Sequence, residues 1–450
     1  MRLGHFDKPG PLQQITPSAL CTPEAQATAR EGSAQGAALF KNDKTTLPLD
    51  ASSLKTLAVV GPNANLSQAM AGYYGPNDVC FGKFPAMLDA ISHYVPHAAV
   101  KYAAGVPSVL SANTSGVAAA AALAKEADVT VLVLGTDLTV AKENHDAVNL
   151  TFSHGQLALV DAVTAVSARP VVVITLTAVP LDLTPLLTNP KVGAILHAGQ
   201  PSIQTLGVAD VLFGAVSPAG RAVQTVYPPA YQHMVSPFDF NMRPGPSRWP
   251  RPDSPGPCAD PYVKPVVPSA NCTLGTNPGR TYRFYNGEAV VPFGHGLSYT
   301  SWTYTIISAP PTASLTPLRS LLKRTAVRAG VDRGPIFPRL SEVGAAAQYT
   351  VNVTNTGKVD ADDVVLGFIS LPGAGQGGRP LKTLFGFERV HVRAGDTVSV
   401  YLYPQLTELA ATLDDGAREP IAGRYTVSFG VRKGLAAGMG FAETGLDVVE

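Results

Sequence analysis

The first half of the chain alternates between short apolar runs and stretches with helical spacing. The apolar, mostly β-branched runs predict strands at residues 57–60, 99–103, 129–134, 171–176 and 192–196. Helical periodicity and start signals predict helices at residues 22–42, 84–95, 117–127, 156–168, 181–187 and 203–213. Strands that alternate with helices at this spacing form βαβ units, so we expect an α/β fold with a parallel sheet over residues 40–228.

The pattern changes twice after residue 228. Residues 228–280 are rich in proline, and the missing N–H groups and fixed φ angles predict an ordered connection without regular structure. Short alternating runs then predict strands at residues 302–307, 348–353, 364–370, 383–392, 397–403 and 424–431. Turn signals separate these runs, and their spacing is typical of a β-sandwich of immunoglobulin-like architecture.

These changes divide the chain into four parts, and the predicted fold class is α/β followed by all-β. We expect a leader at residues 1–20, an α/β sandwich domain at 21–228, a proline-rich excursion and return segment at 229–300, and an all-β domain at 301–450. A basic, proline-containing stretch at about 309–342 interrupts the strand pattern of the last part. It is predicted to be a flexible insertion.

Composition excludes two classes of partner. Lys plus Arg (34) nearly equals Asp plus Glu (33), which gives a formal net charge of +1 and no basic surface for nucleic acid. No apolar run approaches the ~20 residues that a membrane-spanning helix needs. We therefore expect neither a nucleic-acid partner nor a membrane.

Cysteines and glycosylation sequons indicate a secreted history. Cys21, Cys80, Cys258 and Cys272 permit three pairings, of which the short Cys258–Cys272 loop is the favoured disulfide. Five N-x-S/T sequons, against about two or three by chance, begin at Asn65, Asn113, Asn149, Asn271 and Asn352. The N-terminal residues lack the apolar segment of a signal peptide. We therefore expect that the front of a secreted protein is absent from this chain.

The acidic loop after the apolar run at 129–134 is the stretch where we expect the chemistry. Gly135 ends the strand, and Asp137, Glu143, His145 and Asp146 follow before a helix that begins near Ser153. Loops that leave the carboxyl ends of strands form the ligand-binding crevice of an open α/β sheet. The alternative is an ordinary solvated loop, because connecting segments are polar by default.

The other motifs are weaker indications of function. His145 and His154 have no further metal ligands at suitable spacing, so we interpret them as hydrogen-bonded loop residues and not as a metal site. No cofactor or metal is expected. Residues 373–378 match G-x-G-x-x-G, but Arg379-Pro380 and a strand-like run follow where a dinucleotide site needs a helix. That motif is predicted to be a hairpin loop.

Carboxylates suggest one specific chemistry. Glycoside hydrolysis uses a pair of carboxyl groups, one that protonates the leaving oxygen and one that attacks the sugar or activates water. A carboxyl group that stays protonated near neutral pH needs desolvation or a neighbouring negative charge. Asp146, three residues after Glu143, either supplies such a charge or orients the loop through backbone N–H groups.

Several collinear segments resemble glycoside hydrolase family 3, in its β-D-xylosidase-like branch. The resemblance covers nearly the whole chain. It is carried by residues 21–23, 37–43, 47–49 and 57–64, by VGAILHAG at 192–199, by 209–214 and SPAGR at 217–221, by GRTYRFY at 279–285, by PFGHGLSYT at 292–300, and by 355–357 and 384–387. Residues 355–357 and 384–387 resemble the family's fibronectin type III-like domain.

The resemblance implies a divided active site. It implies a nucleophilic aspartate in a preceding barrel domain, whose exit segment residues 2–7 resemble. It implies Glu143 as the catalytic acid/base and Asp146 as its supporting residue, matching the family pattern E-G-x-D-R. The chain is then the C-terminal portion of a secreted, retaining, exo-acting β-glycosidase for xylan-type oligosaccharides. Its partners are an oligosaccharide or aryl-glycoside substrate and a barrel domain or partner chain.

Departures from the family pattern support an alternative function. Asn144 stands where glycine is usual, and Ala147 replaces an arginine that can bind carboxylates in bidentate fashion. Ser153-His154 stands in place of Pro-Gly, and Ala222-Val223 in place of Leu-Pro. The alternative is therefore a catalytically inactive carbohydrate-binding or structural module.

Overall fold

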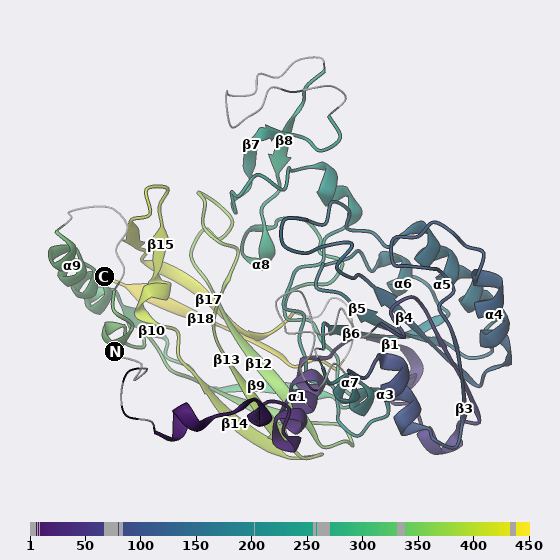
Figure 1. Cartoon of the computed structure of the whole chain (residues 1–450). Coiled ribbons are helices and arrows are strands. Elements are labelled where there is room, and N and C mark those ends of the chain that lie inside the picture. Colours follow the sequence, from purple (N-terminus) through teal and green to yellow (C-terminus); the bar gives the residue numbers. More distant parts are fainter. Residues whose placement is uncertain are drawn as a thin grey trace.

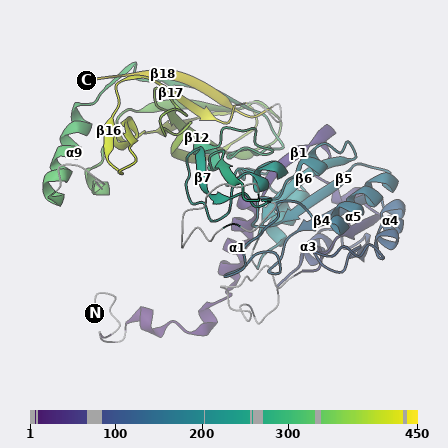
Figure 2. The same cartoon turned by 90° about the horizontal axis from the view of Figure 1, so that it is seen from above.

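The computed structural model describes residues 6, 8, 10–66, 80, 84–201, 203–254, 258, 271–330, 338–432 and 438–450. An α/β part and an all-β part lie next to each other, and a small hairpin rises from the side on which they meet (Figures 1 and 2). The predicted order of an α/β part followed by an all-β part is confirmed. Among the described residues, no helix has the length and apolar character to cross a bilayer.

A six-stranded sheet organises the α/β part, in the order β1-β6-β5-β4-β2-β3. Its strands are β1 Ala38–Asn42, β2 Thr56–Val60, β3 Ala99–Ala103, β4 Val129–Gly135, β5 Val171–Leu176 and β6 Val192–Gly199. The helices are α1 Pro23–Gly36, α3 Met87–Tyr94, α4 Val117–Glu126, α5 His154–Val166, α6 Thr184–Leu187 and α7 Leu206–Leu212.

Both faces of this sheet are covered, which explains why its central strands are apolar throughout. Successive residues of β4 point to opposite faces, so that Val131 and Val133 pack with α1, α3 and α7. Leu132 and Leu134 pack on the other face with α4, α5 and α6. Burial on both faces produces the continuous apolar runs that identified these strands in the sequence.

The first strand corrects two predictions. The helix expected at 22–42 ends at Gly36, and β1 follows at once. The strand is also antiparallel to its neighbour, with Ala38 opposite His197, so that the sheet is mixed and not purely parallel. The physical reason is tertiary: burial against β6 outweighs the helix propensity of an alanine-rich segment.

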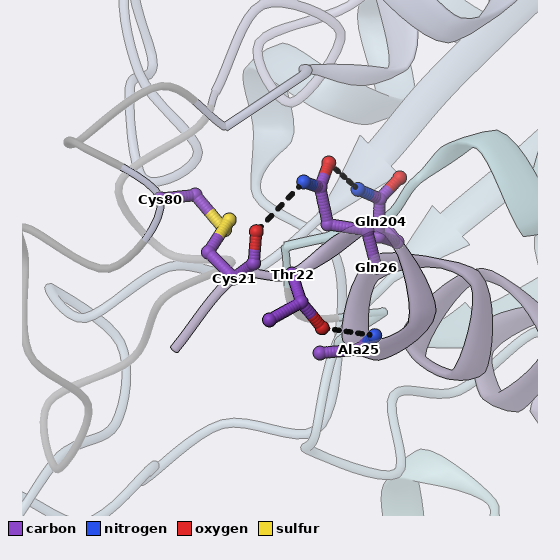
Figure 3. The surroundings of a disulfide bond; sticks show 6 residues. All are labelled: Cys21, Thr22, Ala25, Gln26, Cys80 and Gln204. Atoms are coloured by element: carbon purple, nitrogen blue, oxygen red, sulfur yellow. Dashed lines mark hydrogen bonds between the residues drawn. A yellow bond between two sulfur atoms is a disulfide. The ribbon is translucent and has the colours of Figure 1, made fainter. Parts of the chain in front are cut away.

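The start of α1 is fixed by a disulfide and a cap. Cys21 and Cys80 are bonded, and Thr22 accepts a hydrogen bond from the Ala25 N–H at 3.2 Å (Figure 3). Gln26 donates to the Cys21 carbonyl at 3.1 Å and accepts from Gln204 at 3.4 Å. The predicted helix start at Thr22 is confirmed.

The proline-rich segment contains regular structure, which corrects the expectation for residues 228–280. β7 Gly245–Pro250 pairs with β8 Leu274–Asn277 in an antiparallel ladder, and α8 Thr281–Phe284 follows. The prolines are tolerated because a two-stranded ladder consists of edge strands, where an N–H group can be missing. Cys258 is bonded to Cys272, as the favoured pairing predicted.

Two sheets enclose the core of the all-β part. One has five strands in the order β10-β18-β17-β12-β13, and the other has three in the order β14-β11-β9. The strands are β9 Trp302–Ser308, β10 Thr312–Ser314, β11 Tyr349–Asn355, β12 Ala361–Ser370, β13 Thr383–Val392, β14 Thr397–Leu402, β17 Gly423–Gly430 and β18 Phe441–Val449, with a small β15 Ala410–Thr412 and β16 Arg418–Pro420 ladder beside them. Tyr349 and Val351 of one sheet share a core with Tyr425 and Val427 of the other.

The stretch at about 309–342 is not a flexible insertion over its described residues. It contains β10 and the helix α9 Thr316–Ala329, which lies on the outer edge of the all-β part (Figure 1). Leu315, Leu318 and Leu322 are buried in the shared core. Residues 331–337 lie outside the described part, as do residues 2–5 and 7 of the segment that resembled a barrel exit.

A buried ion pair joins the two parts. Arg221, in the segment after α7, donates to the carboxylate of Asp363 on β12 and to the Gly296 carbonyl. Asp363 is 1% exposed and also accepts from the Tyr304 hydroxyl at 2.6 Å. The contact therefore connects three segments that are far apart in the sequence.

Candidate functional site

The acidic loop leaves the sheet at a point where only glycine fits. Gly135 has a φ of 151°, and a Cβ atom there would lie 1.9 Å from the Leu176 carbonyl oxygen. The side chain of Gln156 on α5 accepts from the Gly135 N–H at 2.9 Å and donates to the Gly135 carbonyl at 3.0 Å. It also donates to Val109 at 2.8 Å. This buried amide fixes the end of β4 and therefore the origin of the loop.

The tip of the loop is a tight turn that carries Glu143. Lys142 and His145 exchange backbone hydrogen bonds of 2.9 and 3.0 Å, so that Glu143 and Asn144 occupy the two central positions. Asn144 has a φ of 59°, in the left-handed region. Asparagine tolerates this region better than most residues. The replacement of the usual glycine by Asn144 is thus compatible with the turn.

Glu143 and Asp146 occupy different surroundings. Both residues are exposed, but Asp146 lines a cavity of about 360 Å³ and Glu143 does not. The structure therefore separates the two carboxylates, with one on the cavity wall and the other at the loop tip. Among the described residues, Glu143 has no ion-pair partner, and its side chain does not line the 360 Å³ cavity.

The cavity beside the loop, which we term the acidic-loop cavity, lies at the carboxyl end of β4 and the start of α5. Ser153 caps α5 by accepting from the Gln156 N–H at 3.3 Å, which confirms the predicted helix start. The polar side chains around the cavity include those of Thr139, His145, Asp146, Asn149, His154 and Gln156. Its position matches the crevice expected at the carboxyl end of a strand in an open sheet.

The two histidines of this loop region do not form a metal site with other residues. The His145 ring nitrogen Nε2 lies 3.1 Å from the Thr139 carbonyl oxygen, which positions the ring inside the loop. Across the described part of the chain, no three His, Cys, Asp or Glu side chains come together as metal ligands. Hydroxyl, amide and carboxylate groups line the cavity together with apolar side chains, a combination found in small-molecule sites.

Two histidines, partly buried His197 on β6 and fully buried His295, lie beside Phe40 of β1 and do not line the acidic-loop cavity. His197 packs its ring against Phe40 at 5.1 Å and contacts the Thr175 hydroxyl at 2.9 Å, and burial lowers its pKa to about 4. The His295 ring lies 3.2 Å from the Phe40 carbonyl oxygen, and burial lowers its pKa to about 4 as well. Protonation of either ring places an uncompensated charge in the protein interior.

The structure shows what surrounds two further departures from the family pattern, at Ala147 and at Ala222-Val223. Ala147 is partly buried and packs against the core below α4 and α5. Ala222 is buried and exchanges backbone hydrogen bonds with the turn at Gly294 and His295, whereas Val223 is 79% exposed. Ala147 therefore contributes packing in place of the positive charge of an arginine.

The arrangement of sheet, loop and cavity agrees with a family match. The model of the glycosyl hydrolase family 3 C-terminal domain matches residues 37–299, which is more than half of the chain. The chain belongs to glycoside hydrolase family 3. The predicted resemblance is thereby confirmed, and its β-xylosidase branch is supported by relatives of similar sequence.

These relatives are plant and fungal family 3 proteins. The chain is 32% identical to beta-D-xylosidase 1 of Arabidopsis thaliana, with 96% of this chain and 52% of that protein covered. It is 33% identical to a probable exo-1,4-beta-xylosidase of Aspergillus fumigatus, with 100% and 52% covered. A solved family 3 exo-beta-xylosidase, in complex with a xylobiose aziridine probe, matches at a TM-score of 0.78 and 26% identity, with 99% and 51% covered. The chain spans about half the length of the curated relatives it matches.

Sequence reasoning located the loop but missed Gln156 as the residue that fixes it. The signal is present, because Gln156 precedes Leu159, Val160 and Val163 at spacings of three, four and seven. A polar residue on the apolar face of a helix indicates buried hydrogen bonds. Asn149 and His154 were noted in the sequence as a sequon and as a loop histidine, but not as cavity walls.

Proposed function

We propose that this chain supplies the general acid/base of a retaining, exo-acting β-glycosidase that hydrolyses xylan-type oligosaccharides. Glu143 is the acid/base and Asp146 its supporting residue. The observation that carries the proposal is the position of Glu143 in a fixed turn, beside a cavity at the carboxyl end of the sheet. Family membership and the xylosidase relatives support the choice of substrate.

The proposed reaction needs a second carboxylate from a barrel domain. In the first step that aspartate attacks the anomeric carbon, the glycosidic bond breaks, and Glu143 gives its proton to the leaving oxygen. In the second step water attacks the glycosyl ester, gives its proton to Glu143 and releases the aspartate. Because Glu143 is exposed in this chain, a barrel domain that covers the loop supplies the desolvation a general acid needs.

Asp146 has a distinct part in this proposal. Its side chain lines the acidic-loop cavity, where a carboxylate accepts hydrogen bonds from sugar hydroxyls or from backbone N–H groups. The missing arginine at Ala147 favours the alternative function, an inactive carbohydrate-binding or structural module. In that alternative the cavity binds sugar and Glu143 has no chemical role.

The proposal includes a domain division and a cellular location. We infer an α/β sandwich domain at 21–228, a return segment at 229–300 and a fibronectin type III-like domain at 301–450. We also infer secretion, because two disulfides and five sequons fit an oxidising compartment. Release of N-glycans by an endoglycosidase after expression in a secretory host tests the location, and an unchanged mass contradicts it.

The activity test compares leaving groups. The chain is joined to the barrel domain of a family 3 xylosidase, and Glu143→Gln is assayed on aryl β-xylosides with a poor or a good leaving group. Loss of an acid slows cleavage of the poor leaving group about 10²- to 10⁴-fold, and cleavage of an activated dinitrophenyl group far less. Glu31→Gln, at an exposed position on α1, is the matched control. Equal activity of Glu143→Gln and the control contradicts the proposal.

A further inference from the structure

A second cavity lies apart from the acidic loop, beside α8. It has a volume of about 410 Å³, within the range of small-molecule sites, and we term it the α8 cavity. Its lining residues come from the segments at 180, 223–227, 242, 281–283 and 293. Its walls combine aromatic and polar side chains, including Gln224, Thr225, Tyr227, Tyr282, Arg283 and Phe293.

The strongest sign of a ligand is a buried hydroxyl without a partner. Thr225 is 7% exposed and lines the cavity, and its solvent-shielded Oγ1 atom makes no hydrogen bond with any described residue. The backbone next to it is fixed, because the Val226 N–H donates to the Val291 carbonyl at 2.9 Å and the Val226 carbonyl accepts from the Val290 N–H at 2.8 Å. A buried hydroxyl left unpaired is costly, and a ligand can supply the missing partner once the Thr225 side chain turns its hydroxyl toward the cavity.

The aromatic walls are rigid. Tyr282 stacks on Phe293 at 4.3 Å and accepts the Leu384 N–H at 3.3 Å. Tyr227 accepts the Thr281 N–H at 2.7 Å and stacks on Tyr231 at 4.0 Å. A preformed site loses little conformational entropy when it binds a ligand.

The polar groups favour a neutral ligand with several hydroxyls. Gln224 donates to the Ala178 carbonyl at 3.1 Å, which leaves its side-chain oxygen available as an acceptor. Arg283 offers guanidinium donors, and its charge already interacts with the carboxylate of Glu408. No Asp or Glu of the described chain lines the cavity. Donors and acceptors next to aromatic rings match a sugar ring, which has apolar C–H faces and a polar rim.

The α8 cavity lies near the candidate active site. A narrow cavity of about 20 Å³ shares Leu181 with the acidic-loop cavity, and Pro180, Val223 and Gln224 with the α8 cavity. Pro180 and Leu181, in the segment after β5, therefore lie between the two larger cavities. An oligosaccharide is a ligand that can extend from one cavity toward the other.

We propose that the α8 cavity is a second carbohydrate-binding site that holds a neutral sugar unit of an oligosaccharide. Thr225 and Gln224 contact its hydroxyls, Arg283 donates to it, and Tyr227, Tyr282 and Phe293 line the space around its ring. This inference rests on the proposed function for the choice of ligand, but it does not require Glu143 to be catalytic.

Calorimetric titration of the full chain with xylotetraose tests this site. Val223→Trp fills the cavity mouth from a residue that is 79% exposed, so the fold is not at risk. We expect it to weaken binding at least tenfold. Thr225→Val removes only the hydroxyl, and loss of one hydrogen bond weakens binding about threefold to tenfold. The matched control is Val148→Trp, at a residue that is 89% exposed and lines the acidic-loop cavity.

The outcomes separate this inference from the proposed function. Weaker binding in Val223→Trp and Thr225→Val supports the α8 cavity whether or not Val148→Trp also weakens binding, because the proposed function places sugar in the acidic-loop cavity as well. Weaker binding only in Val148→Trp assigns the sugar to the acidic-loop cavity and overturns the inference, as does the absence of binding at about 10 mM xylotetraose. Glu143→Gln leaves this binding unchanged, so failure of the catalytic proposal shows only in the activity assay.

Discussion

The ion pair between Arg221 and Asp363 is the contact whose removal we expect to cost most. Asp363 is 1% exposed and accepts hydrogen bonds from Arg221, from the Tyr304 hydroxyl at 2.6 Å and from the Val364 N–H at 2.9 Å. The Arg221 side chain is 12% exposed. Replacing Arg221 by methionine leaves a buried carboxylate without its counter-ion, and this class of change costs about 3–5 kcal/mol.

The magnitude follows from the balance between attraction and desolvation. Two unit charges ~4 Å apart attract by about 4 kcal/mol at an effective dielectric constant of ~20, and desolvation offsets much of that attraction. The intact pair therefore contributes little net stability, whereas a buried Asp363 carboxylate without Arg221 strongly destabilises the folded state. We expect the double variant Arg221→Met with Asp363→Leu to be less destabilised than the sum of its single changes.

Scanning calorimetry measures this effect. For a unit of 150–250 residues, 1 kcal/mol shifts the melting temperature by about 2–4 °C, so Arg221→Met should lower it on the order of 10 °C. The control is the exposed pair of Arg424 and Asp447, with side chains 63% and 51% exposed, whose removal costs at most about 1 kcal/mol. If Arg221→Met shifts the melting temperature no more than Arg424→Met, the account of the buried pair is wrong.

Three further predictions concern buried or strained groups. Gln156→Leu should destabilise the chain by about 2 kcal/mol or more in urea unfolding, because both backbone groups of Gly135 lose a buried partner. An effect below roughly 0.5 kcal/mol argues against the role of Gln156 in fixing the end of β4. Asn144→Gly should keep or slightly raise stability, whereas Asn144→Val should cost about 1–2 kcal/mol at φ 59°, and equal melting temperatures contradict this. Because burial lowers the pKa values of His197 and His295 to about 4, below the ~6.5 of the unfolded chain, their stabilisation is present above pH ~6.5 and lost as pH falls toward 4. The drop in melting temperature from pH 7 to 5 should therefore shrink in His197→Phe, and an unchanged drop speaks against it.

The central strands were predictable because their environment is simple. The runs at 129–134 and 171–176 lie in the middle of a sheet that is covered on both faces, so burial alone explains their composition. Local start signals also sufficed for the helices that begin after Thr22 and Ser153. These elements depend on short-range sequence and on burial, which are both visible in one chain.

The missed elements depend on partners that are distant in sequence. β1 closely follows an alanine-rich helix that ends at Gly36, and it forms a strand because β6 lies beside it. The position of α9 was marked by Leu315, Leu318 and Leu322 at helical spacing, but its prolines and charges suggested flexibility. The ladder of β7 and β8 joins segments separated by a disulfide loop, which a proline count does not reveal.

The candidate site was predictable in place but not in detail. Gly135 after a buried strand located the loop, and the family resemblance singled out Glu143 and Asp146. The sequence did not indicate that Asp146 faces a cavity while Glu143 stands exposed at a turn. Nor did it indicate the unpaired hydroxyl of Thr225, because burial without a partner depends on how several segments pack.

The most direct test of the central claim is the leaving-group dependence of Glu143→Gln in the chain joined to a barrel domain. The account predicts that kcat/KM falls about 10²- to 10⁴-fold on an unactivated β-xyloside and far less on a dinitrophenyl β-xyloside, while Glu31→Gln stays near the parent activity. An equal fall on both substrates, or no fall on either, contradicts the assignment of Glu143 as the general acid/base.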